Sequence, residues 1–252
     1  MGEIWTSLLL KPMMNALMGL YFAFDNFGMA VVALTVLISV VSLPLMLPSL
    51  KSAEKMRELQ PQLDKLKKKW AGDKEKLARA QMDFYKEKGI NPAGGCLPQI
   101  LRLVVLIAMY SVFQKVMSAQ TGGDFGPVKE LLYSVFQLPE GFQINLKFLG
   151  MDLAKPDLWH LGKIPLPGIL LSGAAAAQFL SGKMMMPATS KKEEGKKEGE
   201  GGDMMTMMQN QSLYMMPLMT LLFGYTFPAG LILYWLTMSL VMAGQQALLK
   251  KK

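Results

Sequence analysis

The chain has 252 residues, of which 51% are hydrophobic and 18% are charged, with a mean hydropathy of +0.25 and a formal net charge of +8. Soluble globular domains carry about 25% charged residues, so these values exclude an ordinary soluble domain and indicate a membrane protein. Because a helix needs about 20 apolar residues to cross a bilayer, long uncharged runs locate the expected spans.

The N-terminal segment, residues 1–25, is expected to be a helix lying at the membrane interface. Its apolar stretch, residues 12–24, is too short to cross the bilayer. A buried helix packed on the bundle is the alternative. Because the segment lacks a basic n-region and Lys11 interrupts its apolar part, we do not expect a cleaved signal peptide.

Residues 51–90, after the first span, are predicted to form an antiparallel helical hairpin. Apolar residues in its first helix alternate in spacings of three and four, the seam of a coiled coil. They are Met56, Leu59, Leu63, Leu66 and Trp70. Asp73 stands where it can cap the second helix. The hairpin is rich in Lys and Arg, so it is either a solvated spacer or a basic arm that touches lipid headgroups, the ribosome or an incoming chain.

The second span carries the most informative residue of the chain. Arg102 is the only charged residue between Lys88 and Lys115, a stretch of 26 residues that is otherwise mostly apolar. A charge inside a membrane segment is costly, so it is expected to face the bundle interior or a wet cavity and to mark function. Snorkelling of its long side chain to the headgroups is the alternative.

The second half of the chain is expected to hold three more spans. Residues 118–163 form an outer loop with one or two short interfacial helices, and a third span follows. The low-complexity charged tract at residues 191–200 is expected to be disordered. Residues 204–249 are an uncharged run of 46 residues, enough for two spans, and a Phe-Pro-Ala-Gly sequence at 227–230 divides it.

The distribution of basic residues orients the chain. Residues 51–88 contain 12 Lys and Arg against 7 Asp and Glu, and the chain ends in three Lys, whereas residues 115–163 hold 5 of each. By the positive-inside rule the hairpin and the C-terminus are cytoplasmic and the N-terminus is outside. The expected segments are an N-terminal interfacial helix (1–25), a first span (26–50), a cytoplasmic helical hairpin (51–90), a second span (91–117), an external loop (118–163), a third span (164–186), a cytoplasmic charged loop (187–210), a fourth span (211–227), a fifth span (228–249) and a basic C-terminal tail (250–252).

Residue types used in catalysis and metal binding are scarce. The chain has one Cys, which excludes an internal disulfide, and one His, which cannot form a metal cluster. No Gly-rich phosphate loop, paired-carboxylate site or Ser/His/Asp set is apparent in the sequence. We therefore expect neither an enzyme nor a cofactor.

Three motifs resemble those of one family. They are Leu-Pro-Leu at residues 43–45, Asn-Pro-Ala-Gly-Gly-Cys at 91–96 and Phe-Pro-Ala-Gly-Leu at 227–231. In this order and on these spans they resemble the YidC-type membrane protein insertases of the YidC/Oxa/Alb superfamily, over nearly the whole chain. The resemblance implies an all-α membrane protein whose five transmembrane helices enclose a hydrophilic groove, open to the cytoplasm and the lipid and closed outside.

The family pattern places a groove arginine five residues before the Pro of the Leu-Pro-Leu motif, and that position here is Ser39. Arg102 is a candidate replacement. At 1.5 Å per residue, Ser39 lies roughly 12 Å and Arg102 roughly 8 Å from the cytoplasmic ends of their helices. The guanidinium can cover that gap if the two helices adjoin. We therefore expect that the groove charge has moved from the first span to the second.

Other groove candidates follow from the resemblance by position. Thr35, one helical turn before Ser39, matches a substrate-contacting threonine. Leu106 matches an aromatic position on the second span, and Tyr234 and Trp235 match an aromatic pair on the fifth. Three glutamines are candidates for further groove polarity, with packing between helices as the alternative for each: Gln99, Gln114 and Gln178.

The resemblance implies a non-enzymatic insertase and chaperone for nascent membrane proteins, acting alone or with the Sec translocon. The alternatives are a small-solute or anion transporter that uses Arg102 as its binding charge, and a scaffold for membrane complexes. The expected partners are nascent membrane proteins and the lipid bilayer, with the Sec translocon and the ribosome as further candidates and without direct nucleic-acid recognition. The expected location is a bacterial inner (plasma) membrane, as a multi-pass protein.

Overall fold

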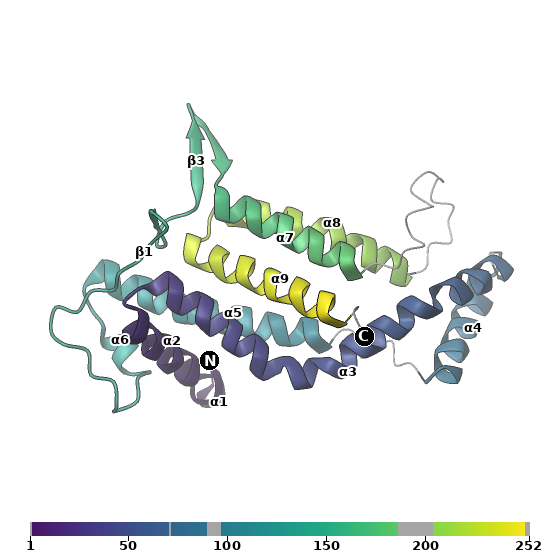
Figure 1. The fold of residues 1–252 in the computed structure, drawn as a ribbon, viewed down its shortest axis with the longest axis horizontal. Helices are drawn as coiled ribbons and strands as arrows, with labels where there is room; N and C mark the ends of the chain where they lie inside the picture. Colours follow the sequence, from purple (N-terminus) through teal and green to yellow (C-terminus); the bar gives the residue numbers. More distant parts are fainter. Residues whose placement is uncertain (1, 71, 90–96, 186–203, 250–252) are drawn as a thin grey trace.

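The computed structural model describes residues 2–70, 72–89, 97–185 and 204–249. Most of these residues are helical, and the long helices run side by side (Figure 1). These are α3 (Phe27–Lys69), α5 (Leu97–Gly122), α7 (Ile169–Met185), α8 (Met204–Gly224) and α9 (Ala229–Leu249). Helix α7 packs against both α8 and α9, and α9 packs against α3.

Several of these helices are long and apolar enough to cross a membrane. In the described part of the chain there are four such stretches: Glu3–Phe24, Phe27–Met56, Ile100–Gly122 and Ala229–Leu248. Helix α7 has 17 residues, and the apolar stretch Leu213–Gly224 of α8 is also shorter. The protein is therefore a mostly helical membrane protein, and the count of five spans stays a prediction.

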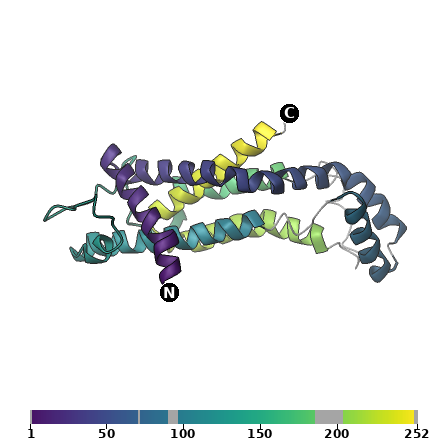
Figure 2. The same ribbon diagram turned by 90° about the horizontal axis from the view of Figure 1, so that it is seen from below.

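The N-terminal helix covers nearly the whole segment predicted for it, residues 1–25. Helix α1 (Glu3–Trp5), the π-helical turn η1 (Thr6–Leu10) and α2 (Lys11–Phe24) follow one another without a break. Figure 2 shows this segment running across α3 rather than along it. One face of α2, which includes Met14, Leu17 and Met18, is buried in the core, so the helix packs on the bundle. Its place at the membrane interface stays a prediction.

Helix α3 does not end where the first span was expected to end. It continues past residue 50 to Lys69, with Pro44, Pro48 and Pro61 inside it. A proline removes one backbone hydrogen bond and commonly bends a helix, and Figure 1 shows α3 changing direction near its middle. The Leu-Pro-Leu motif is therefore a point of bending within a helix and not its end.

Helix α4 (Lys74–Glu87) packs against the last part of α3. Asp73 caps it as predicted, because its side-chain oxygen accepts a hydrogen bond of 3.0 Å from the backbone N–H of Lys76. Leu63 of α3 and Tyr85 of α4 form the centre of a small apolar cluster. The seam predicted from the sequence includes Leu63 but not Tyr85.

The loop after α5 contains strands that the sequence did not predict. One short helix, α6 (Gly126–Lys129), is present, followed by two antiparallel pairs. These are β1 (Lys147–Phe148) with β2 (Met151–Asp152), and β3 (Leu158–Leu161) with β4 (Ile164–Pro167). Strand β4 occupies the first residues of the expected third span, so the helix begins only at Ile169. Residues 204–210, expected in a loop, belong to α8.

The hydrophobic core lies at one end of the bundle. We call the end that carries β1–β4 the strand end, and the opposite end the α4 end. At the strand end, Phe27 of α3 and Phe113 of α5 are buried edge to face, with 5.2 Å between ring centres. Towards the α4 end, α3 and α5 instead expose apolar residues such as Val41 and Leu103. The tight packing thus fixes the helices at the strand end.

Candidate functional site

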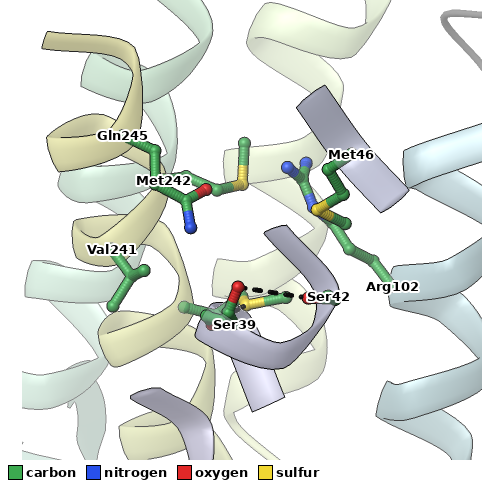
Figure 3. A pocket seen from close by; sticks show the side chains of 8 residues that line it. Ser39, Ser42, Met46, Arg102, Val241, Met242 and Gln245 are labelled. Carbon is green, nitrogen blue, oxygen red and sulfur yellow. Dashed lines mark hydrogen bonds between the residues drawn. The ribbon is translucent and has the colours of Figure 1, made fainter. Parts of the chain in front are cut away.

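A small pocket lies between α3, α5 and α9, on the α4 side of the core (Figure 3). The side chains that line it are Ser39, Ser42, Met46, Arg102, Met238, Val241, Met242 and Gln245. The cavity between them is about 10 Å³. Since a cavity needs about 10–15 Å³ to hold one water molecule, the pocket has room for about one water and not for a helix.

Arg102 reaches into this pocket from α5. Figure 3 shows its guanidinium beside Met46, pointing towards the space between α3 and α9. Its Nε is buried and has no hydrogen-bond partner among the described residues, and no described Asp or Glu forms an ion pair with it. A partly buried cation without a counter-ion attracts water or an anionic group, because its desolvation is not compensated within the protein.

Ser39 lines the same pocket as Arg102, but Thr35 does not. The hydroxyl of Ser39 donates to the carbonyl oxygen of Thr35, and that of Thr35 to the carbonyl oxygen of Val31, each at 2.7 Å. Thr35 is only 1% exposed and does not line the pocket. Ser39 and Arg102 therefore line one pocket, while Thr35 is packed one turn deeper, and the transfer of the groove charge to Arg102 stays a prediction.

The predicted aromatic pair on α9 is divided between two environments. Consecutive helical residues point about 100° apart. Tyr234 is buried and belongs to the hydrophobic core. Trp235 instead packs edge to face against Phe227, with 5.9 Å between ring centres. Leu106, one turn after Arg102, packs against the hydrophobic core. None of these three side chains lines the pocket.

The candidate glutamines have different surroundings. Gln178 of α7 accepts a hydrogen bond of 2.7 Å from the hydroxyl of Thr220 of α8, which is the packing between helices given as its alternative. Gln114 donates to the hydroxyl of Tyr110 within α5, at 2.8 Å. The side chain of Gln99 lies outside the described residues.

Sequence reasoning missed several residues that line the pocket. On α9, Met238, Met242 and Gln245 recur at spacings of four and three, so they share one face of the helix. Ser42 follows Ser39 by three residues and lies on the same side of α3. The spacing is visible in the sequence. The family motif ends at Trp235, however, so no motif marked the later turns of α9.

Some sequence predictions concern residues outside the described ranges. These are the motif at 91–96 with Cys96, the charged tract at 191–200 and the basic tail at 250–252. His160 is exposed on β3. Within the described ranges, no group of three or more His, Cys, Asp or Glu side chains is arranged to hold a metal ion.

Comparison with known proteins places the chain in a family. The model of the 60Kd inner membrane protein family matches residues 19–252. A membrane protein insertase YidC of Fusobacterium nucleatum is 34% identical over 227 residues, which cover 90% of this chain and 87% of the relative. One from Clostridium tetani is 30% identical over 226 residues, covering 90% and 82%. One from Lawsonia intracellularis is 33% identical over 240 residues, covering 95% of this chain but only 38% of that relative.

The comparisons and the structure agree. The family match and the long apolar helices together support a protein of the inner membrane with several spans. The match extends over most of the chain, including all the residues that line the pocket. The chain belongs to the 60Kd inner membrane protein family, the YidC-type family that its three motifs resemble.

Proposed function

We propose that the protein inserts newly made membrane proteins into the bilayer and assists their folding, without catalysing a chemical reaction. The observation that carries this proposal is Arg102, a cation without a described counter-ion in a pocket between three helices. The names of the relatives from Fusobacterium nucleatum and Clostridium tetani, membrane protein insertase YidC, support the same activity.

In this proposal the pocket is the inner part of a hydrophilic groove among five spans. The α4 end faces the cytoplasm and the strand end faces outward, which accords with 12 Lys and Arg in residues 51–88. The hairpin formed by the end of α3 and by α4 is a cytoplasmic arm, and the N-terminal helix lies at the outer interface. The packed core at the strand end closes the groove on the outside.

The groove lowers the cost of moving a polar tail into the membrane. Water and the hydroxyls of Ser39 and Ser42 replace part of the hydration that the tail loses in hydrocarbon. Arg102 attracts an acidic tail transiently, in place of the groove arginine that the family resemblance implies on the first span. The apolar segment of the client then moves into the lipid, driven by burial of its own apolar surface. The membrane potential contributes about 2.3 kcal/mol per charge per 100 mV.

The clients in this proposal are nascent membrane proteins. The Sec translocon and the ribosome are proposed as partners on the strength of the family resemblance, with the basic arm as their contact surface. Thr35, Leu106 and Trp235 are proposed to contact clients only after the helices separate, because in the structure they pack against neighbouring residues.

The test is insertion of a short single-span client with an acidic N-terminal tail into proteoliposomes that contain the purified protein. Arg102→Ala is expected to lower the yield about tenfold, because a charge-assisted contact is worth roughly 1.5 kcal/mol or more. Arg102→Lys is expected to retain most activity. Arg79→Ala is the matched control, since Arg79 is an exposed arginine on α4 that pairs with Glu75. Equal yields for Arg102→Ala and Arg79→Ala would contradict the proposal.

A charge-swap variant tests whether the position of the cation matters. Ser39 and Arg102 line the same pocket, so Ser39→Arg in the Arg102→Ser background is expected to restore insertion. Failure of the swap, in a protein that still elutes as the folded species, would show that the charge cannot act from α3. Anion flux that depends on Arg102 without client insertion would support the transporter alternative instead.

A further inference from the structure

The β3–β4 hairpin has one face made entirely of large apolar side chains. Side chains alternate between the two faces of a strand, and residues paired across strands share a face. Trp159 pairs with Leu166, and Leu161 pairs with Ile164. These four side chains therefore lie on one face, and each is between 39% and 71% exposed. We call them the apolar hairpin face.

The opposite face of the hairpin has a different character. It carries His160 opposite Pro165, and Lys163 lies in the turn between the strands. The side chains of His160 and Lys163 are both exposed. Gly162 occupies the first turn position with φ of 66°, the conformation that a tight two-residue turn requires there. A two-stranded hairpin alone is marginally stable in water, and an exposed apolar patch on a protein surface indicates an interaction site.

The hairpin is held firmly on the N-terminus of α7. The side chain of Asp157 is buried, and its Oδ2 accepts a hydrogen bond of 2.9 Å from the backbone N–H of Leu171. The backbone N–H of Gly168 donates to the carbonyl oxygen of Asp157 at 2.8 Å. A Cβ at Gly168 would collide with the Asp157 side chain. The direction of the hairpin relative to α7 is therefore set by packing and capping.

That direction places the hairpin along the membrane surface. Figure 1 shows β3 and β4 projecting sideways beyond the end of α7, steeply inclined to the long helices. Because helices of a membrane protein run across the bilayer, an element at this angle runs along its surface. Ile169, the first residue of α7, is 64% exposed, and Leu222 and Phe223 at the same end of α8 are exposed as well. Exposed apolar side chains thus occur both on the hairpin and at the adjoining ends of α7 and α8.

We propose that the apolar hairpin face binds the lipid interface at the strand end and anchors the start of α7 to the membrane surface. Trp is enriched where the acyl chains meet the headgroups, and Trp159 lies on this face. Lys163 and His160 lie where they can contact headgroups and water. Strand pairing satisfies the backbone groups that face each other within the hairpin, and the groups on its two outer edges can bond to water at the interface. This proposal does not depend on the insertase activity.

The test uses single-cysteine variants of the full chain in lipid nanodiscs, where both leaflets are accessible. In a Cys96→Ser background, Leu161→Cys reports on the apolar hairpin face and His160→Cys, the adjacent residue, on the opposite face. Each cysteine carries an environment-sensitive NBD dye. The dye at 161 is expected to emit at shorter wavelength and to be quenched several-fold more strongly by spin-labelled lipid than the dye at 160. Aqueous iodide is expected to show the reverse order.

A second labelled position shows whether the result at residue 161 reflects the whole face or only a local distortion by the substitution. Trp159→Cys lies on the same face as Leu161→Cys, two residues earlier, and its dye is expected to behave in the same way. Equal iodide quenching at residues 159, 160 and 161 would overturn the proposal. Protection of 159 and 161 that appears only when a client protein is added would also overturn it, because the face would then bind protein and not lipid.

Discussion

The two ends of the bundle use the same helices but differ in packing and in polarity. At the strand end, α3 and α5 bury aromatic and aliphatic side chains in one continuous core, with Phe27 against Phe113. At the α4 end, the same helices diverge from close packing and present Ser39 and Arg102 to a pocket. Close apolar packing and the polar pocket thus lie in different parts of the bundle. We therefore expect that substitutions in the core alter stability and that substitutions in the pocket alter function.

The largest expected difference between the two ends concerns packing. Leu34 and Leu45 lie on the same helix, α3, but are 1% and 56% exposed. Leu34→Ala is expected to destabilise the protein by about 2–5 kcal/mol because it leaves a cavity in the core. Leu45→Ala should change stability by no more than about 0.5 kcal/mol. Thermal unfolding of both variants in detergent checks this, and comparable losses would mean that the α4 end is packed as tightly as the strand end.

A second pair of substitutions compares the two ends of α9. A Cβ at Gly230 would collide with the buried ring of Phe113, whereas a Cβ at Gly244 meets nothing within 4 Å. Gly230→Ala is therefore expected to cost about 1–3 kcal/mol through overpacking. Gly244→Ala should stabilise the helix by up to about 1 kcal/mol. Unfolding midpoints measured side by side give the answer, and a destabilising Gly244→Ala would show close packing there.

A buried polar side chain joins α2 to the segment that follows α6 at the strand end. Asn15 of α2 is buried, and its side chain donates to the carbonyl oxygen of Leu131 at 2.8 Å and accepts from the backbone N–H of Tyr133 at 2.7 Å. Asn15→Leu would leave both backbone groups unpaired, at a cost of about 1–3 kcal/mol. Hydrogen exchange at residues 131–135 should accelerate, while exchange in α4 should not change. Unchanged exchange at Tyr133 would contradict this role of Asn15.

The smallest expected effect concerns the cap of α4. Hydrogen bonds from the backbone N–H and side chain of Lys76 lower the pKa of Asp73. A carboxyl whose pKa is lower in the folded protein stabilises it above the pKa of the unfolded chain, and this contribution is lost as pH falls through the folded pKa. Exchange in the first turn of α4 should therefore be less protected at acid pH in the wild type. Asp73→Asn should remove this pH dependence, and Asp83→Asn on the same helix should retain it.

The sequence predicted the helices and the pocket cation better than it predicted the ends of elements. Uncharged runs located α3, α5, α7, α8 and α9 because lipid-spanning helices must exclude charge, and the lone charge of Arg102 marked the pocket for the same reason. Residues 164–182 form one uncharged run, so the change from strand β4 to helix α7 left no trace in the charge pattern. The prolines at 165 and 167 and the glycine at 168 were the available signal for this boundary.

Two further differences have physical explanations. The first span was expected to end at residue 50, but its helix continues to Lys69 and accommodates three prolines, since neighbouring groups can satisfy the freed backbone atoms in a membrane helix. Tyr234 and Trp235 were treated as a pair because they are adjacent in sequence, whereas helical geometry sends their side chains in different directions. Ser42, Met242 and Gln245 were missed because only their spacing, and no motif, connects them with Arg102.

Helix α3 has a mechanical consequence. It runs without interruption from the Ser39 region to the hairpin with α4, and Pro44 and Pro48 lie on either side of Met46, which lines the pocket. From Pro48 to Lys69 the helix is roughly 32 Å long at 1.5 Å per residue. By the same length, a tilt of about 5° at the prolines displaces its tip by roughly 3 Å. A force applied to the far end of α3 would therefore act on the helix at these prolines, close to Ser39 and Ser42 of the pocket.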